Sequence, residues 1–417
     1  SSRKMVPLLA ASKRPARSSF ASVNAPFLKP NNSLSKKAIY VRGRARYEAE
    51  DYAGAITDIE QSRAGLQNDR DKADALCLLG LCHVALKQYN KAVPLFDELL
   101  KNHTSYPAAD DIRYQLAWAL KLSGDEDRAT TEFQRLGQGN PSSEIGAESQ
   151  YHVGQRAFDR KDYAAAKAAF ETAAKSNDKE LARNATHRLA WTCYQMDDID
   201  GAIAAFDRQV TSYPASDRIE NDAYFMLAEC RFQKKQYKEA VEAYGKLKLD
   251  QLSSDEFRSL AMLHAAQAAS QNNDQPKAIL WLDRLIADYP KSNEIATAMY
   301  ERGWIEQQKD QKDNAIQWYQ KVVDQSSGEE AARAQFMIGE IQFERKQHAE
   351  AIKSYFNVLY GYNYPQWQAD AAYEAARCFE VLEKPSQAVK LYRELIETFP
   401  DSDKVEPART RIKAIEG

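Results

Sequence analysis

One short pattern returns ten times along the chain at an almost constant spacing. Each copy carries an alanine, and successive alanines lie 36 to 38 residues apart. These marker alanines are Ala55, Ala92, Ala129, Ala166, Ala202, Ala240, Ala278, Ala315, Ala351 and Ala388. A unit of this length cannot bury an apolar face alone, so its copies must stack and share one core. The period therefore predicts a solenoid with one continuous core.

Within each copy the apolar residues recur at helical spacing, as in AYFMLAECRFQKKQYKEAVEAY (223–244). A second small residue lies twelve positions before each marker alanine, and we call it the crossing residue. The crossing residues are Gly43, Gly80, Ala117, Gly154, Ala190, Ala228, Ala266, Gly303, Gly339 and Ala376. Two helices approach closely only where neither carries bulk. Each copy is therefore predicted to be a hairpin of two helices joined by a polar turn.

Four residues after the marker alanine, an apolar or aromatic residue usually follows, and we call it the plug residue. It lies on the same face of the second helix as the alanine, so we expect it to fill the gap to the next repeat. The plug residues of nine copies are Phe96, Phe133, Phe170, Phe206, Tyr244, Leu282, Tyr319, Tyr355 and Tyr392.

The order aromatic, Leu, Gly or Ala, polar turn with Tyr, Ala, aromatic resembles that of tetratricopeptide repeats, most clearly in LCLLGLCHVALKQYNKAVPLF (76–96). The resemblance covers about 38–400. It implies an all-α, right-handed superhelical solenoid of about ten helical hairpins plus a C-terminal capping helix. The expected organisation is a basic non-repeat segment (1–37), ten repeats (38–403) and the capping helix (404–417).

The connectors between some repeats carry a finer resemblance. YPASD (213–217), YPKSN (289–293) and FPDSD (399–403) each precede a new first helix. Proline stops the preceding helix, and the Ser or Asp is expected to cap the next one. Such connectors look like those of bacterial envelope repeat proteins of the Tol–Pal-associated and outer-membrane assembly lipoprotein type. The chain shows no lipid-attachment cysteine near its start and no N-terminal coiled coil. The resemblance favours the periplasm or cell envelope, with the cytoplasm as the alternative.

Charge is distributed unevenly along the chain. Residues 1–37 hold eight Lys or Arg and no acid, so this segment has a charge of +8. Because the net charge of the whole chain is −3, residues 38–417 carry −11. An acidic body argues against a nucleic-acid groove, which needs clustered cations. The basic segment resembles an organellar transit peptide, and a contact with an anionic membrane is a lesser expectation. No apolar run approaches the roughly 18 residues of a membrane span.

The sequence offers little for catalysis. It contains no glycine-rich phosphate loop, no His-Glu-x-x-His and no Gly-x-Ser-x-Gly. The six histidines are scattered over different repeats, and the five cysteines show no Cys-x-x-Cys spacing. We therefore expect no enzyme, no cofactor and no metal site, and we expect the cysteines to be buried free thiols.

Variation on the first helix of each repeat is more informative. In the repeat family, the residues three before and one after the crossing residue are among those that line a concave groove, and their i, i+4 spacing puts them on one helix face. A further groove position lies three residues on. Candidate partner-binding residues at these positions are Arg44, Tyr114, Trp118, Phe158, Trp191, Tyr194, Glu229, Phe232, Tyr300, Trp304, Glu340 and Phe343. For Tyr114 and Tyr300 the favoured interpretation is partial core packing against the neighbouring repeat. The tryptophans favour contact with a partner, because Trp offers a large area with few rotatable bonds.

The predicted function is a non-catalytic scaffold that binds a peptide or an extended protein segment in an aromatic, acidic groove. The bound segment is expected to be basic or apolar-aromatic. The alternatives are a structural spacer or a regulatory subunit of a larger complex, and binding of the basic segment 1–37 to the groove of its own chain or a neighbour. An enzyme is the least favoured.

Overall fold

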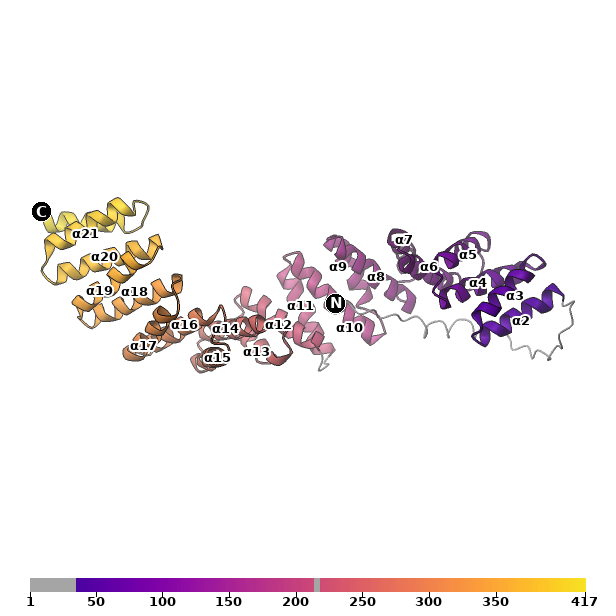
Figure 1. Cartoon of the computed structure of the whole chain (residues 1–417), viewed down its shortest axis with the longest axis horizontal. Helices are drawn as coiled ribbons and strands as arrows, with labels where there is room; N and C mark the ends of the chain where they lie inside the picture. Colours follow the sequence, from indigo (N-terminus) through magenta and orange to yellow (C-terminus); the bar gives the residue numbers. More distant parts are fainter. Residues whose placement is uncertain (1–34, 214–217) are drawn as a thin grey trace. The chain divides into compact units, whose positions relative to one another are not determined.

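The computed structural model describes residues 35–213 and 218–417, and all regular elements in these ranges are helical (Figure 1). The predicted all-α class is confirmed. The described residues form two compact units, unit 1 up to residue 213 and unit 2 from residue 218, whereas the repeat period runs through this boundary without a break. The expectations for the segment 1–37 fall almost wholly on residues outside the described ranges.

Unit 1 consists of five helical hairpins that follow one another in sequence order, each first helix packing on its second helix and the second helix on the next first helix. The helices are α2 (Lys36–Glu48), α3 (Tyr52–Arg63), α4 (Asp69–Ala85), α5 (Tyr89–Asn102), α6 (Ala109–Ser123), α7 (Glu126–Gly139), α8 (Glu144–Asp159), α9 (Tyr163–Ala173), α10 (Lys179–Gln195) and α11 (Ile199–Ser212).

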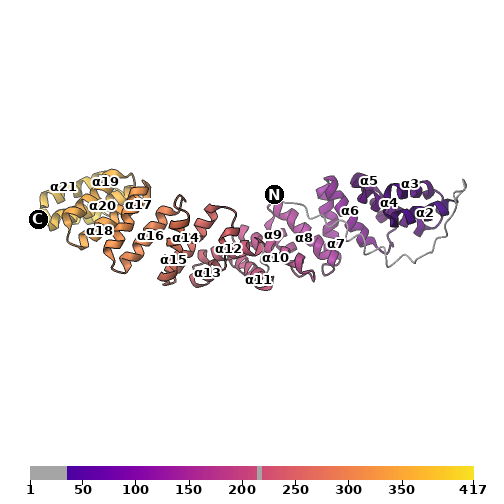
Figure 2. The same ribbon diagram turned by 60° about the horizontal axis from the view of Figure 1, so that its bottom comes forward.

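Unit 2 repeats this arrangement with five hairpins and one further helix, α22 (Val405–Glu416), that packs on the last hairpin (Figure 2). Its hairpins are formed by α12 (Arg218–Gln233), α13 (Tyr237–Tyr244), α14 (Asp255–Gln271), α15 (Gln275–Asp288), α16 (Ile295–Gln308), α17 (Lys312–Gln325), α18 (Glu329–Glu344), α19 (His348–Gly361), α20 (Pro365–Val381) and α21 (Pro385–Thr398). A short 3-10 helix, η2 (Leu249–Gln251), lies between α13 and α14. The described residues thus contain the ten predicted hairpins.

Every hairpin turns at the same place, seven residues after the crossing residue. The residue there is left-handed in all ten hairpins, although only Gly124 is a glycine. At Lys87, φ is 60°, its N–H bonds to the Val84 carbonyl, and the Gln88 N–H bonds to the His83 carbonyl. These two bonds form a Schellman cap, which satisfies the last carbonyls of the first helix. The hairpin geometry therefore outweighs the cost of a left-handed side-chain-bearing residue.

The crossing and plug residues form the centre of each hairpin. A Cβ added to Gly80 would lie 2.3 Å from Phe96 Cε1, and one added to Gly154 would lie 2.7 Å from Phe170 Cε1. The crossing glycine is therefore small because the plug ring of its own hairpin covers it. The plug rings are almost fully buried, and Phe96 shares a core cluster with Ile112 of the next hairpin. The plug thus fills the interior of its hairpin as well as the predicted gap.

The connectors end the helices as expected, but they do not cap the next ones. Helices α16 and α22 begin without a side-chain cap. Ser292 Oγ is buried without a hydrogen-bond partner, while Ser402 Oγ accepts from the Lys404 N–H at 3.1 Å. The prediction that Ser292 caps α16 is therefore wrong. Ser292 belongs to a backbone turn, in which its N–H donates to the Tyr289 carbonyl, and this turn lies before the start of the helix. Most of the 213–217 connector lies outside the described residues.

Candidate binding face of the first helices

The first helices meet along a line that the sequence alone did not fully reveal. At two junctions, one in each unit, the residue one position after a crossing residue contacts the residue two positions before the next crossing residue. The Trp118 and His152 rings lie 4.7 Å apart, and His264 Nδ1 lies 3.0 Å from Glu229 Oε2. The surface formed by these two positions is called the first-helix face below. It runs from repeat to repeat within each unit.

The predicted residues three positions before the crossing belong mainly to the core. Tyr114 and Tyr300 are 7% and 3% exposed. Tyr114 packs edge-on to the plug Phe133 with 6.2 Å between ring centroids, and Tyr300 lies 5.3 Å from the plug Tyr319. The structure favours the core interpretation for both tyrosines.

The three predicted groove tryptophans differ in their surroundings. Trp118 is half-buried and packs edge-on to Phe133 at 6.0 Å, with Lys121 Nζ 5.2 Å from its ring. Trp191 is half-buried against Tyr194 and the plug Phe206. Trp304 is 37% exposed and has no ring or cation contact among the described residues. Trp304 is thus the tryptophan most accessible to a partner.

The predicted aromatic residues four positions after the crossing carry a planar side chain from the next repeat. Arg188 Cζ lies 5.6 Å from the Phe158 ring, and Arg377 Cζ lies 5.2 Å from the Phe343 ring. His264 stacks on Phe232 with 5.1 Å between centroids and 10° between planes. A guanidinium over an aromatic face is an attractive contact. These rings therefore help to join successive repeats.

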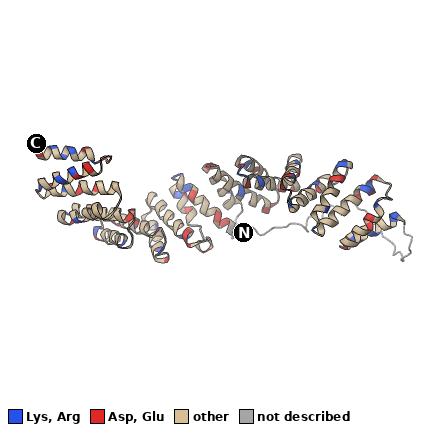
Figure 3. Cartoon of the chain, turned by 45° about the horizontal axis from the view of Figure 1, so that its top comes forward, with Lys and Arg blue, Asp and Glu red and all other residues tan. Residues whose placement is uncertain are grey.

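Charge separates the two units along this face. In unit 1 its ionisable residues are Arg44, His152 and Arg188, whereas unit 2 contributes four carboxylates, Glu229, Glu301, Glu340 and Glu374, together with His264 and Arg377. Charges of both signs are spread over the helices as a whole (Figure 3). The predicted aromatic and acidic groove is therefore two surfaces, with the acidic positions confined to unit 2.

The plug residues support this difference. They are phenylalanines in four hairpins of unit 1 and tyrosines in four hairpins of unit 2. The Tyr244 hydroxyl donates to Glu229 Oε1 at 2.6 Å, and the Tyr355 hydroxyl donates to Glu340. The plug tyrosine thus accompanies a carboxylate on the first-helix face in two of the four hairpins, whereas the Tyr319 and Tyr392 hydroxyls donate to Gln307 and Glu380.

Several carboxylates on this face are partly desolvated. Burial raises the pKa of Glu301, Glu340 and Glu374, because the charged form loses hydration. Glu374 is paired with Arg377 at 2.7 Å. In the part of the chain that the structure describes, neither Glu301 nor Glu340 forms a direct ion pair. Their charges are therefore only partly compensated.

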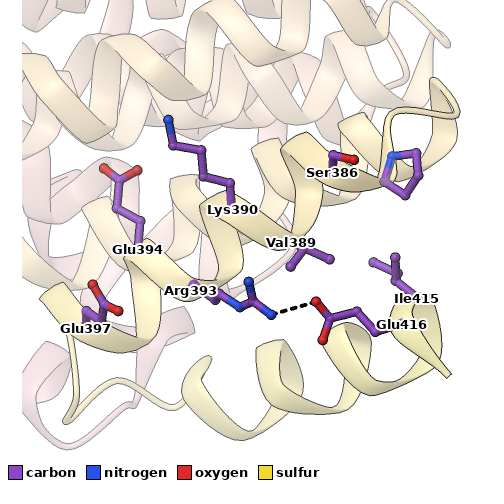
Figure 4. A pocket seen from close by; sticks show the side chains of 9 residues that line it. Ser386, Val389, Lys390, Arg393, Glu394, Glu397, Ile415 and Glu416 are labelled. Atoms are coloured by element: carbon purple, nitrogen blue, oxygen red, sulfur yellow. Dashed lines mark hydrogen bonds and ion pairs between the residues drawn. The ribbon is translucent and has the colours of Figure 1, made fainter.

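The cavities of the structure lie elsewhere. A cavity of about 730 Å³ is lined by residues of α21 and α22, among them Lys390, Arg393 and Glu416 (Figure 4). A second, of about 280 Å³, is lined by residues between Asp110 and Ile145. The Arg393 guanidinium bonds to Glu416 at 2.6 Å across the first cavity wall. No predicted groove residue lines either cavity, so the candidate site is an open face.

The cysteines and the potential metal ligands bear on the chemical reactivity of the chain. All five cysteines are free and buried, and burial raises the pKa of Cys77 to about 12. Such thiols remain protonated and behave as small apolar residues. The described residues contain no group of three or more potential metal ligands, and none of their helices has the length and apolarity to cross a membrane.

Stacked hairpins with a small crossing residue and a buried plug define a helical-repeat protein. Models described as tetratricopeptide repeat or repeat-like domain match residues 40–107, 83–246, 260–292, 296–327, 326–366 and 370–402. The chain belongs to the tetratricopeptide repeat family.

Solved structures of related proteins were also compared. Yeast Tom70 is 13% identical, with 91% of this chain and 95% of that chain covered and a TM-score of 0.36. The C-terminal part of a repeat-containing protein from Cytophaga hutchinsonii is 15% identical, with 62% and 98% covered and a TM-score of 0.42. A repeat protein from Parabacteroides merdae is 12% identical, with 65% and 99% covered and a TM-score of 0.38. No curated protein sequence matches the chain.

Proposed function

We propose that this chain is a non-catalytic scaffold that binds an extended segment of a partner protein along its first-helix face. The observation that carries the proposal is the line of side chains from successive repeats, in which the ring of Trp304 is exposed. An extended segment contacts such a line over several repeats, so many weak contacts add up.

The two units offer different chemistry to the bound segment. Unit 1 presents Trp118 and Trp191 beside cationic residues, which suits an apolar-aromatic stretch. Unit 2 presents carboxylates, which suit a basic stretch. A location in the periplasm or cell envelope, as the connectors indicate, is part of the proposal.

Capture from a native extract tests this function. Replacing Trp191 and Trp304 by Ala should abolish capture of the main crosslinked partner, because both rings leave the face. Trp118 is unsuitable for this test, since its ring contacts His152 of the next repeat and its loss would disturb the junction between the repeats. Trp318→Ala is the matched control, because Trp318 lies on a second helix. Circular dichroism must first show that each variant is folded. Equal capture by all variants would contradict the proposal.

The basic segment 1–37 is the second candidate occupant of the face, motivated by its eight cations. If it binds there, its deletion should increase capture of an external partner. If the chain is only a structural spacer or a regulatory subunit held by another surface, the tryptophan substitutions should leave capture unchanged.

A further inference from the structure

Unit 2 repeatedly places a planar side chain beside both an aromatic ring and a carboxylate. His264 stacks on Phe232 and lies 3.0 Å from Glu229. Arg377 lies over Phe343 and pairs with Glu374 at 2.7 Å. In both cases the planar group comes from the repeat after the one that supplies the ring. The chain thus uses one mode of recognition twice.

A third junction shows the same combination. Arg333 Cζ lies 4.1 Å from the Tyr300 ring centroid. The charge of Arg333 also acts to lower the pKa of Glu301, although burial outweighs it and the net shift is upward. Ring, carboxylate and guanidinium therefore recur at the contacts between successive repeats of this unit.

Trp304 lies on the same helix as Tyr300 and Glu301, but the Arg333 guanidinium lies over the ring of Tyr300 and not over that of Trp304. Trp304 lies on α16 three residues after Glu301, and this spacing places both side chains on one face of the helix. Trp318 on the neighbouring helix, by contrast, is covered by Lys321 Nζ at 3.7 Å and Arg302 Cζ at 5.5 Å. No described cation covers Trp304, and its ring is 37% exposed.

Glu340 supplies a second carboxylate on the neighbouring first helix. It occupies on α18 the position that Trp304 occupies on α16, and the two helices are in contact. Met337 lies one turn before Glu340 on α18. It occupies the position relative to Trp304 that His152 occupies relative to Trp118, so the pattern places it opposite Trp304 of the preceding repeat. Trp304, Glu301 and Glu340 are called the Trp304 site below.

The two carboxylates of the site favour a cationic ligand. Glu301 and Glu340 are partly desolvated, and neither has a direct ion pair among the described residues. Three partly buried carboxylates, Glu301, Glu340 and Glu374, share the charges of two guanidiniums, Arg333 and Arg377. One carboxylate is thus in excess, and a ligand cation relieves the cost of burying it. Arg377 lies near Glu340 but is already bonded to Glu374. The charge complementarity thus points to a cation brought from outside the chain.

We propose that the Trp304 site binds an arginine side chain of an extended segment from a partner protein. The inference rests on the proposed function and adds the chemistry of its ligand. Arginine is favoured over lysine because the planar guanidinium stacks on indole, donates to two carboxylates at once and is less strongly hydrated. The segment runs along unit 2, where the intramolecular Arg333 covers Tyr300 at this junction and Arg377 covers Phe343 at the next one.

A peptide titration tests the proposal on the full chain. The probe is a fluorescein-labelled peptide of about 12 residues, with arginine at every third position and glycine and serine between. A second peptide carries lysine in place of arginine. Fluorescence anisotropy is recorded at about 50 mM and about 200 mM salt, to separate specific contacts from screened attraction.

The binding site is then altered without changing the net charge relative to a control. The double variant Glu301→Gln with Glu340→Gln, and Trp304→Ala alone, should each weaken arginine-peptide binding about tenfold. The control double variant Glu242→Gln with Glu350→Gln removes two exposed carboxylates from second helices and should retain binding within about twofold. Trp304→Phe should restore part of the affinity lost in Trp304→Ala.

The outcomes separate this inference from the proposed function. Equal loss in both double variants, or equal affinity for the arginine and lysine peptides, would overturn the Trp304 site. If the glutamine variant at Glu301 and Glu340 still captures the partner that the Trp191 and Trp304 variant loses, the proposed function stands and the arginine site is wrong. If Trp191 and Trp304 are dispensable for capture while the peptide discriminates as expected, the arginine site stands and the wider function is wrong.

Discussion

At the scale of single residues, the carboxylates on the first-helix face of unit 2 are the most informative groups. Two of them, Glu229 and Glu340, accept a hydrogen bond from a plug tyrosine, and burial raises the pKa of Glu301, Glu340 and Glu374. Such groups lower stability at the pH where they are charged, and this cost is expected at binding sites. Glu301 is the simplest case, because it has no direct ion pair among the described residues.

Glu301→Gln should therefore not reduce stability at neutral pH. The pKa of Glu301 is raised in the folded state, so between the unfolded and folded pKa values the native state binds more protons. The free energy of unfolding of the wild type therefore falls as the pH rises through the folded pKa of Glu301. The variant has no titrating group there, so it does not show this decrease. Urea unfolding at about pH 5 and about pH 8 should show the variant gaining relative to wild type at the higher pH. A variant less stable than wild type by about 1 kcal/mol or more at about pH 8 would contradict this account.

Residue patterns identified some of these positions from sequence and missed others. The pattern found five residues of the first-helix face, because i, i+4 spacing on a regular helix fixes which side chains share a face. These residues are Trp118, Trp191, Trp304, Glu229 and Glu340. His152, His264 and Glu301 were missed. Their contact with the preceding repeat depends on how far successive first helices are offset, and helical spacing does not determine that offset.

At the scale of the elements, the hairpin depends on two positions that respond differently to substitution. The regular spacing of the crossing residues revealed them in the sequence. The reason for their small size, the plug ring packed against them, is visible only in the structure. The turn residue was missed, because Lys, Glu, Asp or Asn occupies the left-handed position in nine of the ten hairpins and gives no glycine signal. Sequence therefore predicted where the hairpins lie better than how they are held.

The crossing residue should not tolerate bulk. Gly154→Val is expected to destabilise the fold by about 2 kcal/mol or more, since even a Cβ would lie 2.7 Å from Phe170 and the ring is fully buried. Gly139→Val is the matched control, because a Cβ there meets nothing within 4 Å. Thermal unfolding followed by circular dichroism compares the two. Similar melting temperatures would show that the close approach at Gly154 is unimportant.

Glycine at the left-handed turn position should stabilise the fold. Lys346→Gly is expected to raise stability by up to about 1 kcal/mol, since φ is 61° there and a left-handed side-chain-bearing residue is strained. Gly124→Ala should lower stability by about 1 kcal/mol at φ 96°. Chemical unfolding measures both changes. A loss of stability in Lys346→Gly would mean that the lysine side chain contributes more than its strained backbone costs.

At the scale of the whole molecule, the chain is one repeat family arranged as two units with different first-helix faces. The uniform period predicted the ten hairpins, because stacking requires the same small and bulky positions in every copy. It could not reveal the boundary at residues 213 and 214, because the interval there, 38 residues from Ala202 to Ala240, is ordinary for this chain. The charge difference between the units appears only when residues are sorted by their place on the face.

Site-specific photo-crosslinking in native extract tests the central claim, that the first-helix face binds a partner protein. A photoreactive amino acid is placed in separate variants at Gln155 and Gln267 on this face, and at the exposed Glu242 and Glu350 on second helices. The account predicts adducts with one and the same protein from the face positions and none from the second-helix positions. Adducts from Glu242 or Glu350 alone would show that the partner binds the other side of the repeats, and the central claim would then be wrong.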